Sequence, residues 1–363
     1  MRILIACDSF KDALPADGVC RAIARGLRTA HPNAIITEMP LSDGGEGVLD
    51  IARERLSLAS VTVTADDPLG RKLSARYGLS ADGGTALVEM AQASGLQLLA
   101  AQERNPLLTS SFGTGQLLAD AKARGARRIF LAIGGSATND AGIGMAAALG
   151  WQFLDSKGGA VITGGGLQDI VRIVPPQALP FESVEVLCDV TNPLFGPTGA
   201  AFTYGRQKGG TEESLKALDA GLAHVASLVA GGTALAQVPG AGAAGGLGFG
   251  ALAFLNAKLR RGIDMVLDMT GFDAAAAASD LVITGEGQID GQSAQGKLVQ
   301  GVCKRAGKTP VIALCGKLSA TAEQIKAIGL KAAYCINAVE QPLPDMLAAT
   351  AANLEKAAAR IPL

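Results

Sequence analysis

A glycine-rich loop at residues 134–140 has the composition of a phosphate-binding segment. The loop, GGSATND, follows an apolar run at 129–133 and precedes a stretch of small residues. Free backbone amides at the start of a helix bind phosphate oxygens, so the loop is a candidate anion site. The same letters also fit a tight strand-to-helix turn capped by Thr138 or Asn139, and the residues alone leave both interpretations equally open.

Carboxylates beside glycines follow a second apolar run, at residues 34–39. Asp43 and Glu46 stand within the sequence SDGGEG. Two carboxylates next to exposed amides suit a cation-bridged phosphate or the hydroxyls of a substrate. A helix start is the alternative, with Asp43 as the N-cap and Glu46 completing a capping box.

A third cluster follows the predicted strand at 280–284 and contains Glu286, Asp290 and Lys297. Ligands of open parallel sheets bind at the carboxyl ends of the strands, where this cluster is expected. Residues 291–297 nearly match the Walker A pattern, but Leu298 replaces the Ser or Thr that would hold magnesium. We therefore do not interpret the segment as a P-loop.

Asp189 follows the core run VEVLC and precedes Thr191, Asn192 and Pro193. A carboxylate at this position could accept a hydroxyl proton or hold magnesium, as phosphoryl transfer requires. The sequence DVTNP is also typical of a turn, because Asp and Asn side chains bond to nearby backbone and proline stops a strand.

The segment at 240–245 has the spacing GxGxxG of a dinucleotide-binding loop. Pro239 stands where the preceding strand should end, so the match is weak. A closely packed loop that needs small residues is the favoured interpretation.

Apolar runs at both ends of the chain alternate with helical stretches and predict parallel strands. These runs lie at 2–7, 34–39, 280–284, 310–315 and 332–336. We expect an α/β protein of two domains: a doubly wound, Rossmann-like parallel sheet formed by 1–65 and 275–363, and an inserted α/β domain, 66–274, with a mixed sheet. The active site is expected in the cleft between the domains.

Composition excludes several classes of function. The chain of 363 residues carries a net charge of -1 and has no long run of one sign, so nucleic acid is not an expected partner. Only two histidines are present, which excludes a histidine-rich zinc site. Six cysteines without CxxC spacing, no signal peptide and no apolar run of about 20 residues predict a cytoplasmic protein without a membrane segment.

Seven motifs in order along the chain together resemble the bacterial type I glycerate kinases. They are DSFK at 8–11, SDGGEG at 42–47, GGSATND at 134–140, CDVTNPL at 188–194, QKG at 207–209, PGAGAAGG at 239–246 and TGEGQIDGQS at 284–293. The resemblance implies phosphorylation of D-glycerate by ATP with Mg²⁺, 2-phosphoglycerate being favoured over 3-phosphoglycerate. Cys7, where the family usually has proline, and Ala141, where it usually has glycine, depart from the pattern.

The resemblance also suggests roles for individual residues. Asp189 is the expected base, with Lys11 as a second catalytic group, and Glu286 and Asp290 are the expected metal ligands. The expected substrate-binding residues are Asp8, Ser9, Asp43, Glu46, Asn192 and Lys208. The expected ATP- and phosphate-binding residues are Gly134, Gly135, Ser136, Thr138, Asn139, Gly285 and Lys297.

Two other functions compete with this one. The GxGxxG spacing allows a nicotinamide-dependent dehydrogenase of a small hydroxy acid, and two α/β lobes allow a sugar-acid-binding protein without catalysis. The sequence leaves open the hydroxyl that receives phosphate and the oligomeric state, for which a homodimer is one candidate.

Overall fold

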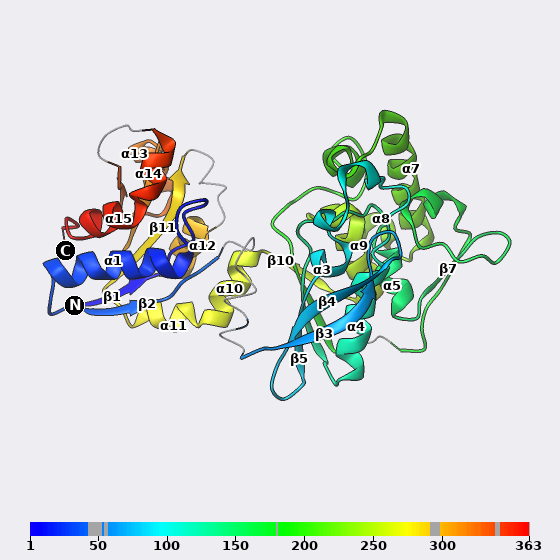
Figure 1. The fold of residues 1–363 in the computed structure, drawn as a ribbon, viewed down its shortest axis with the longest axis horizontal. Helices are drawn as coiled ribbons and strands as arrows, with labels where there is room; N and C mark the ends of the chain where they lie inside the picture. The colour runs from blue at the N-terminus through cyan, green and yellow to red at the C-terminus, as the bar shows by residue number, and fades with distance from the viewer. Residues whose placement is uncertain (43–52, 54–56, 179–180, 291–297, 338–341, 363) are drawn as a thin grey trace. The chain divides into compact units, whose positions relative to one another are not determined.

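A computed structural model describes residues 1–42, 53, 57–178, 181–290, 298–337 and 342–362 (Figure 1). The chain forms two compact units, Met1–Arg55 with Gly262–Leu363, and Leu56–Arg261. These boundaries differ from the expected ones at 65/66 and 274/275. The difference arises because strand β3 (Ala59–Asp66) pairs along its whole length with β4 of the second unit, while the helices α10 (Gly262–Thr270) and α11 (Phe272–Ala277) fall in the first unit.

The first unit contains a five-stranded sheet in which every pair is parallel. Its order is β13-β12-β11-β1-β2, with bounds Ala332–Cys335, Val311–Leu318, Leu281–Ile289, Arg2–Ile5 and Ile35–Glu38. This is the doubly wound order, and the expected parallel sheet built from both termini is confirmed. The winding direction changes between β1 and β11, and such a switch point is where these sheets bind ligands.

Amphipathic helices cover this sheet because its central strands β1, β11 and β12 consist mostly of buried apolar residues. Helices α1 (Ala16–Ala30) and α15 (Thr350–Ala358) pack closely together, and a Cβ added at Gly26 would lie 2.1 Å from the carbonyl oxygen of Glu355 (Figure 1). Their buried side chains share one core with strand residues such as Ile3, Ile5 and Ile283. The structure also describes α12 (Leu298–Arg305), α13 (Ala322–Ile328) and α14 (Leu343–Ala348) in this unit.

The second unit contains the expected mixed sheet, in the order β10-β9-β6-β5-β4-β3. The β3–β4 and β4–β5 pairs are antiparallel, and the pairs from β5 to β10 are parallel. The strands after β3 are β4 (Lys72–Leu79), β5 (Thr85–Glu89), β6 (Arg128–Ala132), β9 (Ser183–Leu187) and β10 (Lys258–Arg260); β7 (Gln152–Leu154) and β8 (Arg172–Val174) form a separate pair.

Helices of the second unit bury their apolar faces in two hydrophobic clusters. They are α3 (Ala91–Ser94), α4 (Phe112–Ala123), α5 (Ile143–Ala148), α6 (Ala200–Tyr204), α7 (Glu212–Leu228), α8 (Gly232–Leu235) and α9 (Ala243–Leu255). Short 3-10 helices span Leu96–Leu98, Ala101–Glu103, Gly164–Asp169 and Arg206–Lys208. No helix in the described part of the chain is both long and apolar enough to cross a bilayer.

Strand β11 is longer than its apolar sequence indicates. The expected strand ended at residue 284, which was wrong, because residues 285–289 continue the pairing with β12 as far as Ile289↔Leu318. Gly285 and Glu286 therefore belong to a strand and not to a loop. Glycine at 285 permits this close pairing, since a Cβ there would lie 2.5 Å from the carbonyl oxygen of Leu314.

Candidate active site

The switch point of the first unit contains a pocket of about 650 Å³. Such a volume suits a small ligand or a nucleotide. The loop after β1, the end of β11 and the end of β12 contribute most of its polar lining: Asp8, Ser9, Lys11, Asp12, Glu286, Gln288 and Lys317; Asn337 and Thr350 complete it. The structure therefore brings together the DSFK and TGEG motifs, which lie more than half the chain apart in sequence.

The DSFK segment is held in a tight loop by its own backbone. Phe10 is 3% exposed, and its backbone exchanges hydrogen bonds of 2.8 and 2.9 Å with that of Leu14. The backbone amide of Asp8 donates to the carbonyl of Gly285 at 3.0 Å, which ties the loop to β11. Ser9 donates its backbone amide to the Asp8 carboxylate at 2.6 Å. The buried phenyl ring anchors the loop, so Asp8 and Lys11 line the pocket.

Three carboxylates line this pocket, the pair Asp8 and Glu286 together with Asp12, and Lys11 and Lys317 supply two cations. Among the described residues, no group of three or more Asp, Glu, His or Cys side chains could hold a metal ion. A magnesium ion is usually held by one or two carboxylates together with substrate phosphates and water, so the pair fits it. Asp290 does not line the pocket; its carboxylate accepts a hydrogen bond of 3.1 Å from Gln288.

In the second unit, three parallel strands end side by side. Glu89 of β5, Ala132 of β6 and Leu187 of β9 are in register. The same edge of the sheet therefore carries Glu89, the start of the 134–140 loop and Asp189. Glu89 is not among the predicted site residues, although it is a carboxylate in the expected strand TALVEM, next to the strand that leads into the glycine loop. Lys317 of the first unit, which follows the apolar run VIALC and lines the switch-point pocket, is not among them either.

The 134–140 loop has an exposed tip and a buried base. Gly134 and Gly135 are exposed, and a Cβ at Gly134 would meet nothing within 4 Å. Ser136 is 8% exposed, whereas Thr138 and Asn139 are completely buried. The Thr138 hydroxyl and the Asn139 amide atoms have no hydrogen-bond partner among the described residues. Phosphate contact is thus expected at the tip, with Thr138 and Asn139 beneath it.

Lys208 lies under this loop and holds it from inside the protein. Its side chain is 2% exposed, and its ammonium donates to the Ser136 hydroxyl at 2.7 Å and to the Thr138 carbonyl at 2.8 Å. Burial lowers the pKa of Lys208 to about 7, and the charge of Asp140 opposes this shift. The expected contact of Lys208 with substrate stays a prediction. In this structure the ammonium contacts the loop.

Asp140 closes the base of the loop by accepting several hydrogen bonds. Its carboxylate accepts the Ser111 amide and hydroxyl, both at 2.7 Å, and the Gly142 amide at 3.1 Å. Burial raises the pKa of Asp140, and the hydrogen bonds from Ser111 and the backbone lower it in part. This buried carboxylate fixes the start of α5.

The side chain of Asn192 is engaged within the second unit. Its amide donates to the Thr198 carbonyl at 2.8 Å, and its oxygen accepts the Tyr204 hydroxyl at 2.6 Å. These bonds order the turn that follows Asp189, as the DVTNP sequence indicated. The expected contact between Asn192 and substrate remains a prediction.

The glycine loop at 240–245 is a packing element. A Cβ at Gly242 would lie 2.1 Å from the carbonyl oxygen of Pro193, and one at Gly245 would lie 2.0 Å from that of Thr138. Helix α8, and not a strand, precedes the loop. The dinucleotide interpretation is therefore wrong, and the packing interpretation is confirmed. The loop holds the 134–140 and 189–193 segments in place.

Ala141 adopts a left-handed conformation, with φ of 54°. Glycine accommodates this region without strain, whereas alanine pays a steric cost. The loss of backbone freedom expected from this departure is therefore visible in the structure. Asp43, Glu46 and Lys297 lie outside the described residues, so their expected roles remain predictions.

The fold and the two sets of strand-end residues define a two-unit α/β protein that presents carboxylates, lysines and a glycine loop. Residues 3–362 match the sequence pattern of the glycerate kinase family. A glycerate kinase of Bacillus cereus is 42% identical over 99% of this chain and 97% of its own length. The glycerate 2-kinase of Escherichia coli K12 is 42% identical, over 93% of this chain and 90% of its own length.

A solved structure agrees with these sequence relatives. A crystal structure described as glycerate kinase 2 from Salmonella typhimurium LT2 has a TM-score of 0.85 at 40% identity, and the match covers 99% of this chain and 96% of that one. The chain therefore belongs to the glycerate kinase family.

Proposed function

We propose that this protein is a kinase that transfers the γ-phosphoryl group of ATP to a hydroxyl of D-glycerate, with 2-phosphoglycerate favoured over 3-phosphoglycerate. The match to the E. coli glycerate 2-kinase at 42% identity over 93% of the chain carries this proposal. Family membership across residues 3–362 disfavours a binding protein without catalysis. All six cysteines are free thiols, which supports a reducing, cytoplasmic location.

In the second unit, the exposed tip of the 134–140 loop is proposed to bind phosphate. The amides of Gly134 and Gly135 and the Ser136 hydroxyl are the contacting groups, while Lys208 and Asp140 fix the loop from beneath. Asp189 follows the strand next to the loop and is proposed to accept the proton of the attacking hydroxyl. As the new oxygen–phosphorus bond forms, the bond to the leaving ADP oxygen breaks.

In the first unit, the switch-point pocket is proposed to bind the charged groups of the substrates. Lys11 and Lys317 suit phosphate or carboxylate oxygens, and Ser9 suits a hydroxyl. Asp8 and Glu286 are the residues that would hold Mg²⁺. When bound, the ion would neutralise phosphate charge. The sequence also suggested Asp290 as a ligand. We propose instead that Asp290 acts indirectly, through the hydrogen bond that its carboxylate accepts from Gln288.

The arrangement favours catalysis by positioning and charge neutralisation, because phosphoryl transfer needs little covalent chemistry from the protein. Buried tethers such as the Lys208–Thr138 bond keep the loop in one geometry before substrate arrives. The prediction of an active site between the two units stays a prediction.

A coupled ADP-release assay with ATP, Mg²⁺ and D-glycerate tests the function, and ³¹P NMR of the product identifies the phosphorylated hydroxyl. We expect glycerate-dependent turnover and 2-phosphoglycerate. Folded protein that binds ATP but shows no glycerate-dependent turnover would contradict the proposed substrate, and 3-phosphoglycerate would contradict the regiochemistry.

A further inference from the structure

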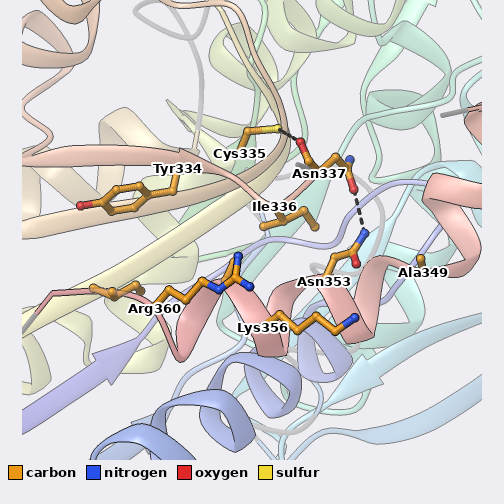
Figure 2. A pocket seen from close by; sticks show the side chains of 10 residues that line it. Tyr334, Cys335, Ile336, Asn337, Ala349, Asn353, Lys356 and Arg360 are labelled. Carbon is orange, nitrogen blue, oxygen red and sulfur yellow. Dashed lines mark hydrogen bonds between the residues drawn. The ribbon is translucent and has the colours of Figure 1, made fainter. Parts of the chain in front are cut away.

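A second pocket of the first unit lies beside the switch-point pocket, and no step proposed above uses it (Figure 2). Its volume is about 500 Å³. The end of edge strand β13 and the two residues after it form one wall, and helix α15 with the residues that flank it forms the other. Asn337 lines both pockets, so the two adjoin at this residue. Like the switch-point pocket, this one opens at the carboxyl edge of the parallel sheet, where ligands of such folds bind.

The lining of this pocket is cationic. Lys356 lies in the last turn of α15, Arg360 lies two residues beyond the end of the helix, and both are exposed. Among the residues that the structure describes, no acidic side chain lines the pocket and neither cation has an ion-pair partner. The nearest acidic residue in sequence, Glu355, pairs instead with Arg25 at 2.8 Å. The pocket therefore holds two positive charges that form no ion pair with any carboxylate in the described part of the chain.

An amide pair and an apolar floor give this pocket a defined shape. The amide of Asn353 donates to the Asn337 side-chain oxygen at 3.0 Å, and the Asn337 amide donates to the Gly316 carbonyl at 2.7 Å. These bonds fix α15 against the end of β13, as Figure 2 shows. Ile336 and Ile361, which are 6% and 3% exposed, supply buried apolar surface. The Arg360 guanidinium points toward Ile336 (Figure 2).

We propose that this pocket binds a phosphorylated small molecule, with its phosphate at Lys356 and Arg360 and its carbon skeleton over the two isoleucines. A guanidinium and an ammonium that line one pocket match phosphate oxygens, with arginine able to bind two of them at once. A nucleotide and a phosphorylated hydroxy acid share this chemistry and both fit the volume. The lining residues belong to the first unit and none of them takes part in the Asp189 and glycine-loop chemistry proposed above, and the test of the pocket requires no turnover.

Cys335 offers a direct probe of occupancy. It lines the pocket, and it alone of the six cysteines is exposed. Modification of its thiol by N-ethylmaleimide, followed by mass spectrometry of the full-length protein, reports on this pocket, and Cys335→Ser verifies the labelled position. ADP and 2-phosphoglycerate are the two probes. We expect at least one of them to slow the modification severalfold at millimolar concentration.

The double variant Lys356→Ala/Arg360→Ala tests whether the two cations cause the protection. Both side chains are exposed, so the fold should tolerate their loss. We expect the concentration for half-protection to rise roughly tenfold to a hundredfold, as the loss of charge-assisted contacts implies. Lys326→Ala, which removes an exposed lysine of α13 outside both pockets, should leave the protection unchanged.

Each outcome decides the proposal. Protection by ADP alone identifies a nucleotide site, protection by 2-phosphoglycerate alone identifies a site for a phosphorylated acid, and protection by both identifies shared phosphate recognition. If neither ADP nor 2-phosphoglycerate protected Cys335, the proposal would be overturned. Equal protection in the double variant and the wild-type protein would also overturn it, whether or not the protein phosphorylates glycerate.

Discussion

Replacing Lys208 by methionine should change how the stability of the second unit depends on pH. The side chain is 2% exposed, and burial lowers its pKa to about 7. In an unfolded chain a lysine has a pKa near 10.4. Methionine has a similar length without a titratable group, so the variant isolates the contribution of the ammonium.

The sign and size of the effect follow from proton linkage. Between pH 7 and about pH 10 the unfolded state binds a proton that the folded state has released, so the free energy of unfolding rises with pH. With the pKa near 7 in the folded protein, the rise between pH 7 and pH 9 amounts to about 2 kcal/mol. A neutral amine keeps two N–H donors, enough for Ser136 and Thr138. The wild-type loop should therefore persist at the higher pH.

Urea unfolding followed by the fluorescence of Trp151 measures this effect. Trp151 is the single tryptophan of the chain and belongs to the same unit as Lys208. The stability difference between wild type and Lys208→Met should grow by about 2 kcal/mol in favour of the wild type from pH 7 to pH 9. Lys216→Met, at an exposed position of α7, is the control and should keep the wild-type slope. If the free energy of unfolding changed with pH in the same way for wild type and Lys208→Met, a lowered pKa of Lys208 would be refuted.

Three further predictions test the remaining geometry. Gly245→Ala should destabilise the second unit by about 3–5 kcal/mol in urea, because the new Cβ meets the Thr138 carbonyl at 2.0 Å and φ is +69°; Gly231→Ala, with the same φ and open space, should cost only about 1 kcal/mol. Asp189→Asn should keep the urea midpoint and lower kcat about 10²–10⁴-fold, and near-normal kcat would remove the base assignment. Glu286→Gln should raise the Mg²⁺ concentration for half-maximal turnover about tenfold, and an unchanged Mg²⁺ dependence would contradict its role as a ligand.

Much of the fold could be predicted from sequence because the strands are short, apolar and regularly spaced. The runs at 2–7 and 280–284, which contain Ile3 and Ile283, have too few polar residues for an exposed position, so a sheet covered on both faces was the expected outcome. Strand ends were harder to predict. Glu286 looks like a loop residue in the sequence, yet backbone pairing with β12 keeps it in β11.

The sequence predicted which loops belong to the candidate site, but it did not predict which side chains contact one another there. The motif order indicated phosphate handling, and the DSFK and TGEG segments do line one pocket. The position of Lys208 could not be inferred, because a lysine between Gln207 and Gly209 in sequence is equally compatible with a solvated loop. Only the fold brings the 134–140 loop over it and removes its ammonium from water.

The sequence by itself determined the α/β class, the phosphate-type loops and the resemblance to a kinase family, since these depend on local composition and spacing. The tertiary structure decided which groups are exposed and which are buried. Burial changes the chemistry of a residue: the 134–140 loop divides into an accessible glycine tip and a buried base, and Lys208 acquires a lowered pKa. The cationic pocket at β13 likewise arises only when residues 334–337 and α15 pack together.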